Sequence, residues 1–346
     1  MKNFICECGQ TLFFENTQCL SCGQLVGFDP ATLSMRGVVR TLKRGQRATK
    51  PLLCKNAIDY TVCNWVANAP HSKFCISCEL NDTIPNLLEP TRRSWWQSLE
   101  NAKRRLVYSL LRLKLPIVGK SRDPHGLAFK FIEDQRTNPG VVEEHVMTGH
   151  LDGLITINIA EADIVNRAIT RQYTGELYRT LLGHFRHESG HYYYNRLIVS
   201  PALLERFRSL FGDETRDYAA ALEYYYSPNN PVPRDPAMIS HYAQSHPLED
   251  WAEVWAHYLH MIDTLETAKD YGLHQGSIQF DDFDETLLKW SELTLLLNSL
   301  NRSMGLEDAY PFVLSELTLR KLRFVHDLIY PNSTPRTATA SAEMRP

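Results

Sequence analysis

The sequence predicts a mostly helical α+β domain preceded by a small cysteine-rich module. All eight cysteines lie before residue 80, two apolar segments near the middle have the character of strands, and the rest shows helical periodicity. A chain of 346 residues has room for about two domains of roughly 150 residues each. We expect the module over 1–90, a linker helix over 91–124, the larger domain over 125–330 and a disordered tail over 331–346.

Composition narrows the function classes. Apolar residues make up 43% and charged residues 22% of the chain, which are ordinary globular values and exclude bulk disorder. The sequence has no uncharged apolar run near the roughly 18 residues of a membrane span, and no apolar signal segment at its start. We therefore expect a cytoplasmic protein without membrane contact, whose cysteines bind metal rather than form disulfides.

The charge is divided unevenly along the chain. Residues 1–130 contain 19 Lys and Arg against 9 Asp and Glu, whereas residues 131–346 contain 18 against 31. All the cysteines fall in the basic part. This asymmetry indicates two functionally distinct regions.

The expected elements follow in order. An amphipathic helix is expected over 94–115, where Pro116 ends it. Apolar segments over 127–132 and 151–159 are expected to be strands. Four prolines between 227 and 236 predict a loop. The remaining helices are expected over 161–172, 176–197, 201–211, 215–226, 247–270, 284–303 and 311–329.

The eight cysteines form two sets of four. Four thiolates complete a tetrahedral zinc shell, and close Cys-x-Cys or Cys-x2-Cys pairs place two sulfurs on one tight turn. We expect two structural zinc sites, although pairs from the two sets could also interleave. Gly9 and Gly23 each follow a cysteine, where positive φ lets backbone N–H groups turn towards sulfur. The sets are Cys6, Cys8, Cys19 and Cys22, then Cys54, Cys63, Cys75 and Cys78.

The segment between the two sets is basic, and no acidic residue interrupts the chain from Pro30 to Ile58. We expect a solvated loop, or one that docks on the acidic part of the chain. Nucleic-acid binding is the alternative, because phosphates attract Lys and Arg. The basic residues are Arg36, Arg40, Lys43, Arg44, Arg47, Lys50 and Lys55.

The strongest motif is His187-Glu188-Ser189-Gly190-His191. Two histidines four residues apart on a helix share one face and can bind one zinc ion. Glu188 lies next to the first histidine and is expected to act as general base towards a metal-activated water, which would attack a carbonyl carbon.

A catalytic zinc ion needs a third protein ligand. A metzincin would place a histidine six residues after His191, but a leucine stands there, which excludes that class. Glu249 and Glu253 lie four residues apart on one face of a later helix. We assign Glu249 as the ligand and Glu253 as the acid that holds a ligand histidine by its other ring nitrogen. The reverse assignment, or Asp250 as ligand, stays open.

Three further features border this predicted centre. Tyr242, seven residues before Glu249, could donate a hydrogen bond to the oxyanion of the transition state; an ordinary packed tyrosine is the alternative. His184 lies one turn before His187 and is expected to line the site or pack beneath it. The strand at 154–159 comes shortly before the motif helix. An edge strand there could pair with an extended substrate, or it could serve structure alone.

These segments resemble a bacterial family of zinc-binding metallopeptidases with an N-terminal zinc ribbon. The resemblance rests on the cysteine pairs, the Gly-His-Phe-Arg-His-Glu-Ser-Gly-His segment and the Pro-Leu-Glu-Asp-Trp-Ala-Glu segment, and spans about residues 4–330. The second part is similar, more remotely, to the catalytic domain of anthrax lethal factor. The resemblance implies a zinc ion held by His187, His191 and Glu249, with Glu188 as base, Tyr242 as oxyanion donor and Glu253 as support for a ligand.

Together these expectations describe a zincin-like α+β peptidase of the gluzincin type. It would hydrolyse a peptide or protein substrate with one catalytic Zn²⁺. Two structural zinc ions would stabilise the cysteine-rich module, which would serve partner binding or regulation. We expect a protein partner for this module ahead of nucleic acid. The alternatives are an inert adaptor that binds nucleic acid or protein through its ribbon, and a zinc hydrolase that acts on something other than a peptide.

Overall fold

The computed structural model describes residues 2–40, 51–68, 72–165, 167, 180–227, 232–273 and 278–331. Several expectations lie outside these residues: most of the basic segment (Lys43, Arg44, Arg47 and Lys50), half of the helix expected over 161–172, the start of the one expected over 176–197, part of the 227–236 loop, and the tail from residue 332. None of the helices in the described ranges is long and apolar enough to cross a membrane.

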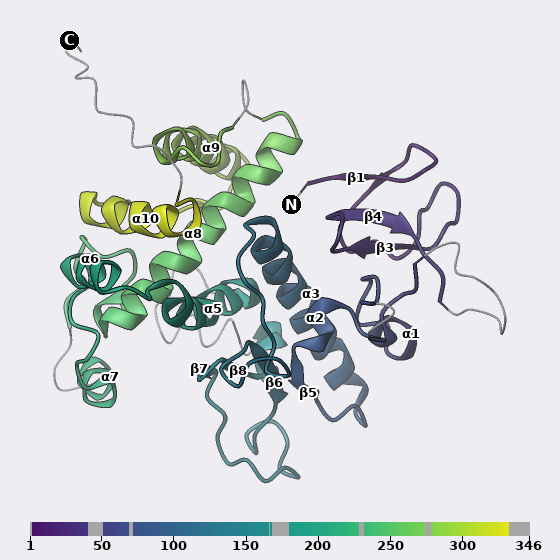
Figure 1. Ribbon diagram of the computed structural model, residues 1–346, viewed down its shortest axis with the longest axis horizontal. Helices are drawn as coiled ribbons and strands as arrows, with labels where there is room; N and C mark the ends of the chain where they lie inside the picture. Colours follow the sequence, from purple (N-terminus) through teal and green to yellow (C-terminus); the bar gives the residue numbers. More distant parts are fainter. Residues whose placement is uncertain are drawn as a thin grey trace.

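The N-terminal module consists of two short antiparallel hairpins and two short helices (Figure 1, purple to blue). Its elements are β1 (Phe4–Ile5), β2 (Thr11–Leu12), β3 (Val26–Asp29), β4 (Ser34–Gly37), α1 (Lys55–Asp59) and α2 (Ile76–Glu79). Strands this short cannot form a stable unit by pairing alone. The module packs instead around Phe28, whose ring centroid lies 5.0 Å from that of Phe14 and 4.7 Å from that of Trp65.

The long helix α3 (Pro90–Arg112) joins the module to the rest of the chain. Its Tyr108 ring lies 5.4 Å from Phe14 of the module, while its Ser109 hydroxyl donates to Asp263 in the helical part at 2.8 Å. The helix begins four residues before the expected start because Pro90 suits a first turn. It ends before Leu113, since Lys114 has a φ of 56° that breaks the helical path.

A four-stranded sheet follows, in the order β5-β6-β8-β7. Its strands are β5 (Asn81–Thr83), β6 (Ala128–Ile132), β7 (Gly149–Leu151) and β8 (Leu154–Asn158). The first three in this order run parallel, and β7 runs antiparallel to β8. The single strand expected over 151–159 is therefore a hairpin, and the expectation of an edge strand at 154–159 is wrong. Asp152 and Gly153 have φ values of 48° and 82° and form the turn, as a two-residue Asp-Gly hairpin loop requires.

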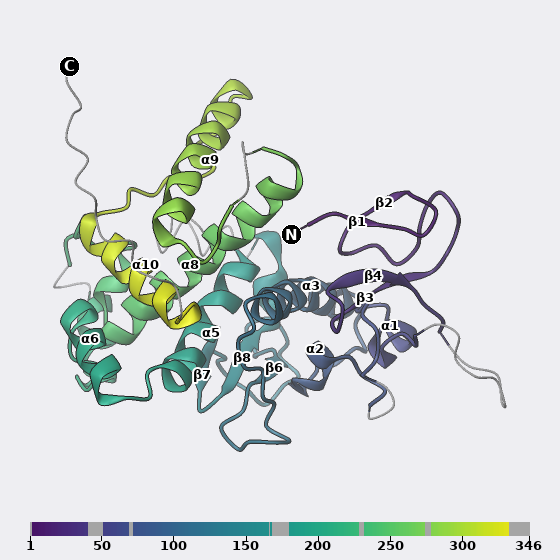
Figure 2. The same cartoon turned by 45° about the horizontal axis from the view of Figure 1, so that its top comes forward.

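The remaining chain is helical. Both views place α8 among α5, α9 and α10 (Figures 1 and 2). The helix expected over 311–329 begins later, because Ser315 accepts a hydrogen bond from the Thr318 N–H and caps it. The fold class expected from the sequence is confirmed. The elements are η1 (Ile159–Ala162), α5 (Leu181–Leu197), α6 (Pro201–Phe211), α7 (Tyr218–Tyr226), η2 (Tyr242–Gln244), α8 (Pro247–Asp270), α9 (Phe283–Ser303) and α10 (Glu316–Ile329).

The close packing of α5 on α8 positions the histidine motif. A Cβ atom on Gly190 would lie 2.9 Å from Cα of Ala252, so only glycine allows this approach. Two buried indoles then tie the helices together. Trp251 donates to the Gly190 carbonyl at 2.8 Å, and Trp255 donates to the Ser189 hydroxyl at 3.1 Å. Ser189 and Gly190, between the two motif histidines, thus serve packing, which aims the histidines at the start of α8.

Candidate metal centre and the two cysteine clusters

Two histidines of α5 and one glutamate of α8 converge. Nε2 of His187 lies 3.0 Å from Oε2 of Glu249, and Nε2 of His191 lies 3.4 Å from Oε1 of the same carboxylate. One potential ligand atom from each residue lies within 4.8 Å of the others. Zinc–ligand distances of about 2.1 Å place two donors of a tetrahedral site about 3.4 Å apart. The donor set and its spacing therefore fit a zinc ion.

Glu249 is buried to 1% exposure in the first turn of α8. Burial alone would raise the pKa of this carboxyl, but its contacts with His187 and His191 lower it well below the ordinary range. A buried carboxylate needs such a positive partner. The site is therefore built to keep this glutamate ionised, as a metal ligand must be.

Glu253 lies one turn further along α8, on the other side of the His187 ring. Its Oε1 lies 2.7 Å from Nδ1 of His187. The Nδ1–H donates to this carboxylate, which leaves Nε2 directed at Glu249. Of the open alternatives, Asp250 faces elsewhere: it forms a 2.5 Å ion pair with Lys321, and both side chains are almost fully buried.

Glu188 follows the first histidine and is 8% exposed. Burial raises the pKa of its carboxyl above the ordinary value, against the opposing effect of His187. A raised pKa makes a carboxylate a better proton acceptor near neutral pH. Its chemistry therefore agrees with the expected role of a general base.

Two tyrosines border the cluster, and the sequence pointed to one of them. The Tyr242 ring centroid, in η2, lies 5.9 Å from that of His187, as the seven-residue spacing suggested. The hydroxyl of Tyr218, at the start of α7, donates to Oε1 of Glu249 at 2.7 Å. Burial raises the pKa of both phenols, so both are donors at neutral pH. No motif or spacing marks Tyr218, because a proline-rich loop separates it from α8.

Two more histidines lie close by. His184 pairs with Glu161 of η1, which explains its place on the motif face without a ligand role. His150, on the edge strand β7, stacks on His191 with ring centroids 6.1 Å apart. Its Nε2 accepts a hydrogen bond from the Gly153 N–H at 2.9 Å, and burial lowers the pKa of the imidazole to about 4. The last strand of the sheet, β7, therefore reaches the metal centre through His150.

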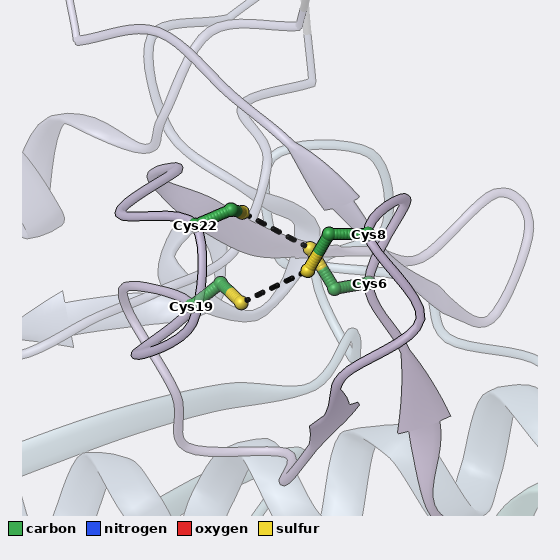
Figure 3. Close-up of side chains that lie close together, drawn as sticks. All are labelled: Cys6, Cys8, Cys19 and Cys22. Carbon is green, nitrogen blue, oxygen red and sulfur yellow. Dashed lines mark hydrogen bonds between the residues drawn. The ribbon is translucent and has the colours of Figure 1, made fainter.

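The cysteines gather in the two sets read from the sequence, not in an interleaved order. In the first cluster, Sγ of Cys6 lies 3.8 Å from that of Cys22, and Sγ of Cys8 lies 3.6 Å from that of Cys19 (Figure 3). A tetrahedral site with Zn–S distances of about 2.3 Å has sulfurs about 3.8 Å apart. Gly9 and Gly23 have φ values of 91° and 73°, as expected for these turns.

The second cluster is fully buried. Sγ of Cys63 lies 3.7 Å from that of Cys75, which again matches a tetrahedral zinc site. Backbone N–H groups donate to three of its sulfurs at 3.4 Å: those of Trp65, Cys75 and Cys78 donate to Cys63, Cys54 and Cys75. Both clusters have the ligand number of closed, structural zinc sites.

Comparison with known proteins places this geometry in context. Residues 92–328 match the model of a family described as "Putative zinc-binding metallo-peptidase", and residues 3–89 match a zinc-ribbon domain. Uncharacterized proteins of Mycobacterium tuberculosis and Mycobacterium bovis are each 42% identical over 340 residues, which cover 95% of both chains. No solved structure matches the chain. The predicted resemblance to a family of zinc-binding metallopeptidases with an N-terminal zinc ribbon is confirmed.

Proposed function

Because the chain belongs to this family of zinc-binding metallo-peptidases, we propose that it hydrolyses peptide bonds at a zinc centre held by His187, His191 and Glu249. The convergence of these three side chains carries the proposal. The arrangement is of the gluzincin type, with two histidines from one helix and a glutamate from a later one. The two cysteine clusters would hold structural zinc, because four thiolates leave no position for substrate.

A zinc ion at the centre would act as a Lewis acid on the scissile carbonyl and would make a bound water more acidic. Glu188 accepts the proton of the attacking water and returns it to the leaving amine. Glu253 holds His187 in the tautomer that keeps Nε2 free for the metal. Tyr242 donates a hydrogen bond to the oxyanion as the tetrahedral state develops.

The edge strand β7 is the proposed place for the substrate. Among the residues that the structure describes, β7 pairs with β8 alone, so an extended peptide could add to its other side. His150 of β7 stacks on His191, so a peptide bound there would pass beside the metal centre. The cysteine-rich module lies across α3 from α5 and α8 (Figures 1 and 2), which suits contact with a protein partner or regulation from a distance.

The first test is the zinc content of the purified full-length chain. We expect about three zinc ions per chain in the wild type and about two in the double variant His187→Ala/His191→Ala, since the cysteine clusters count separately. Glu188→Gln should keep all three and lose cleavage of a peptide library by about 100-fold or more.

An unchanged content near two would overturn the proposal. It would favour the alternative in which the module acts as an adaptor and the helical part is inert. A salt-dependent gel shift without peptide cleavage would then point to nucleic acid as its partner. Three zinc ions without cleavage of any peptide would direct the search to other substrates of zinc hydrolases.

A further inference from the structure

The carboxylate of Glu249 has a partner that belongs to neither the histidine motif nor α8. Tyr218 is the first residue of α7, and its hydroxyl donates to Oε1 of Glu249 at 2.7 Å. The other oxygen, Oε2, lies 3.0 Å from Nε2 of His187. The two oxygens thus have different neighbours. Oε1 also lies 3.4 Å from Nε2 of His191, so the phenol and the two histidines together hold a carboxylate that has almost no contact with solvent.

The position of Tyr218 is itself held by the start of α8. Nδ1 of His246, the N-cap residue of α8, accepts a hydrogen bond from the Leu248 N–H at 3.2 Å. Its Nε2 therefore carries the proton and donates to the Arg216 carbonyl at 3.2 Å. The His246 ring also meets the Tyr218 ring edge to face, with centroids 5.1 Å apart. One imidazole thus ties the beginning of α7 to the beginning of α8.

The N-cap of α7 anchors the backbone next to Tyr218 a second time. Asp217 accepts a hydrogen bond from the Ala220 N–H at 3.0 Å and begins α7 directly after Arg216. The backbone on both sides of Tyr218 is therefore anchored, one side to His246 and the other within the helix. Tyr218 itself is 43% exposed, so its contact with Glu249 rests on this anchored backbone and not on burial of the ring.

We propose that Tyr218 is a positioning residue, which orients Glu249 for the metal with His246 as its support; this inference rests on the proposed function of the site. Partners that hold a metal ligand from outside typically change metal affinity by about 10- to 100-fold when they are removed. Tyr218 and Tyr242 then have separate tasks. The first acts on the ligand carboxylate and the second on the reacting carbonyl.

The experiment measures zinc affinity of the full-length chain by competition with a chromogenic chelator. Tyr218→Phe removes only the hydroxyl, and we expect one zinc ion to bind about 10- to 100-fold more weakly while the other two stay unchanged. Peptide cleavage should recover to within a few-fold of wild type when free zinc is raised. His246→Ala should weaken the binding of the same zinc ion. In the double variant Tyr218→Phe/His246→Ala, the loss of zinc-binding free energy should not exceed the sum of the two single losses.

Tyr224→Phe is the matched control, since Tyr224 lies on the same helix with 59% exposure. It should bind all three zinc ions as the wild type does. Wild-type affinity in Tyr218→Phe would overturn the inference, as would an equal loss at all three sites, which indicates general destabilisation. The double variant His187→Ala/His191→Ala separates the two proposals. If it loses no zinc ion, the proposed function fails; if it loses one that Tyr218→Phe leaves intact, only this inference fails.

Discussion

The two cysteine clusters have the same ligands and different surroundings. In the first, Cys8 and Cys22 are exposed, so water can screen the thiolates. In the second, all four cysteines are buried, and the Arg104 side chain of α3 is buried beside them and donates to the Val62 carbonyl. Water cannot screen the thiolates of the second cluster, so a buried positive side chain beside them offsets part of their charge.

The charges in the second cluster bear this out. Burial alone would lower the pKa of Arg104, but the neighbouring Cys63 thiolate raises it, so the guanidinium stays charged. In the first cluster, backbone N–H groups stabilise a thiolate. The N–H groups of Cys22 and Ser21, against the effect of burial, lower the pKa of Cys19 to about 6. We therefore expect the two clusters to respond differently to the same change.

The largest effect should come from removing a ligand of the buried cluster. In Cys75→Ser the thiolate shell is incomplete, and Arg104 loses part of its counter-charge inside the protein. We expect the free energy of unfolding to fall by about 4 kcal/mol, the size of breaking a buried ionic group. Urea unfolding followed by circular dichroism measures it.

Cys22→Ser is the matched change in the exposed cluster. It should also release one zinc ion per chain, but it should cost only about 1 kcal/mol of global stability, because the exposed turn at 20–22 can open locally while the rest stays folded. Equal losses of stability in the two variants would contradict the distinction between the clusters.

The next effect is that of Arg104→Met, which keeps an unbranched side-chain stem, shorter by the guanidinium end, and removes the charge. We expect a loss of about 3 kcal/mol in the free energy of unfolding. The neighbouring Arg105 provides the control: it pairs with Glu15 at the surface, with the two side chains 44% and 38% exposed. Arg105→Met should change stability by less than about 1 kcal/mol. A similar cost for both would mean that the buried charge has no special role.

The two cysteine clusters should release their zinc ions at different rates. In an excess of chelator we expect two phases of release from the cysteine sites, with rates at least about tenfold apart, equivalent to about 1.4 kcal/mol. The fast phase should be missing in Cys22→Ser, and a chromogenic chelator follows both phases. If the fast phase persists in that variant, the exposed cluster is not the more labile one.

The smallest effect concerns the turn after Cys22. Gly23 has a φ of 73°, and a Cβ atom there would meet nothing closer than 3.9 Å. The cost of Gly23→Ala is therefore backbone strain alone, about 1 kcal/mol. Gly23→Asn should cost less, because asparagine tolerates this conformation better. Thermal unfolding of the two variants compares them, and a larger loss for asparagine would argue against strain as the cause.

Much of the site followed from spacing along single elements. The positions of His187 and His191 on one helix face, and of Glu249 and Glu253 on another, depend only on the helical repeat. The cysteine sets followed from close pairs on tight turns. These predictions needed no knowledge of how helices pack, and the structure brings the same residues together.

Contacts between distant segments could not be predicted in this way. Tyr218 reaches Glu249 only because α7 and α8 begin side by side, and nothing in the chain between them encodes that neighbourhood. The hairpin of β7 and β8 is a different case. The Asp152-Gly153 pair is a strong turn signal within an apolar segment, but the clear alternation that follows it favoured one long strand. The edge of the sheet was therefore misplaced by one strand.

The position of α3 has a consequence for how the protein unfolds. Tyr108 completes the aromatic core of the module, and the next residue, Ser109, holds Asp263, which also accepts from Arg186 of α5 at 2.7 Å. Melting α3 would thus take apart the aromatic core and the support of the histidine helix at once. We therefore expect the module and the helical part to unfold in one cooperative transition, which a calorimetric scan would show as a single peak where two independent domains would give two.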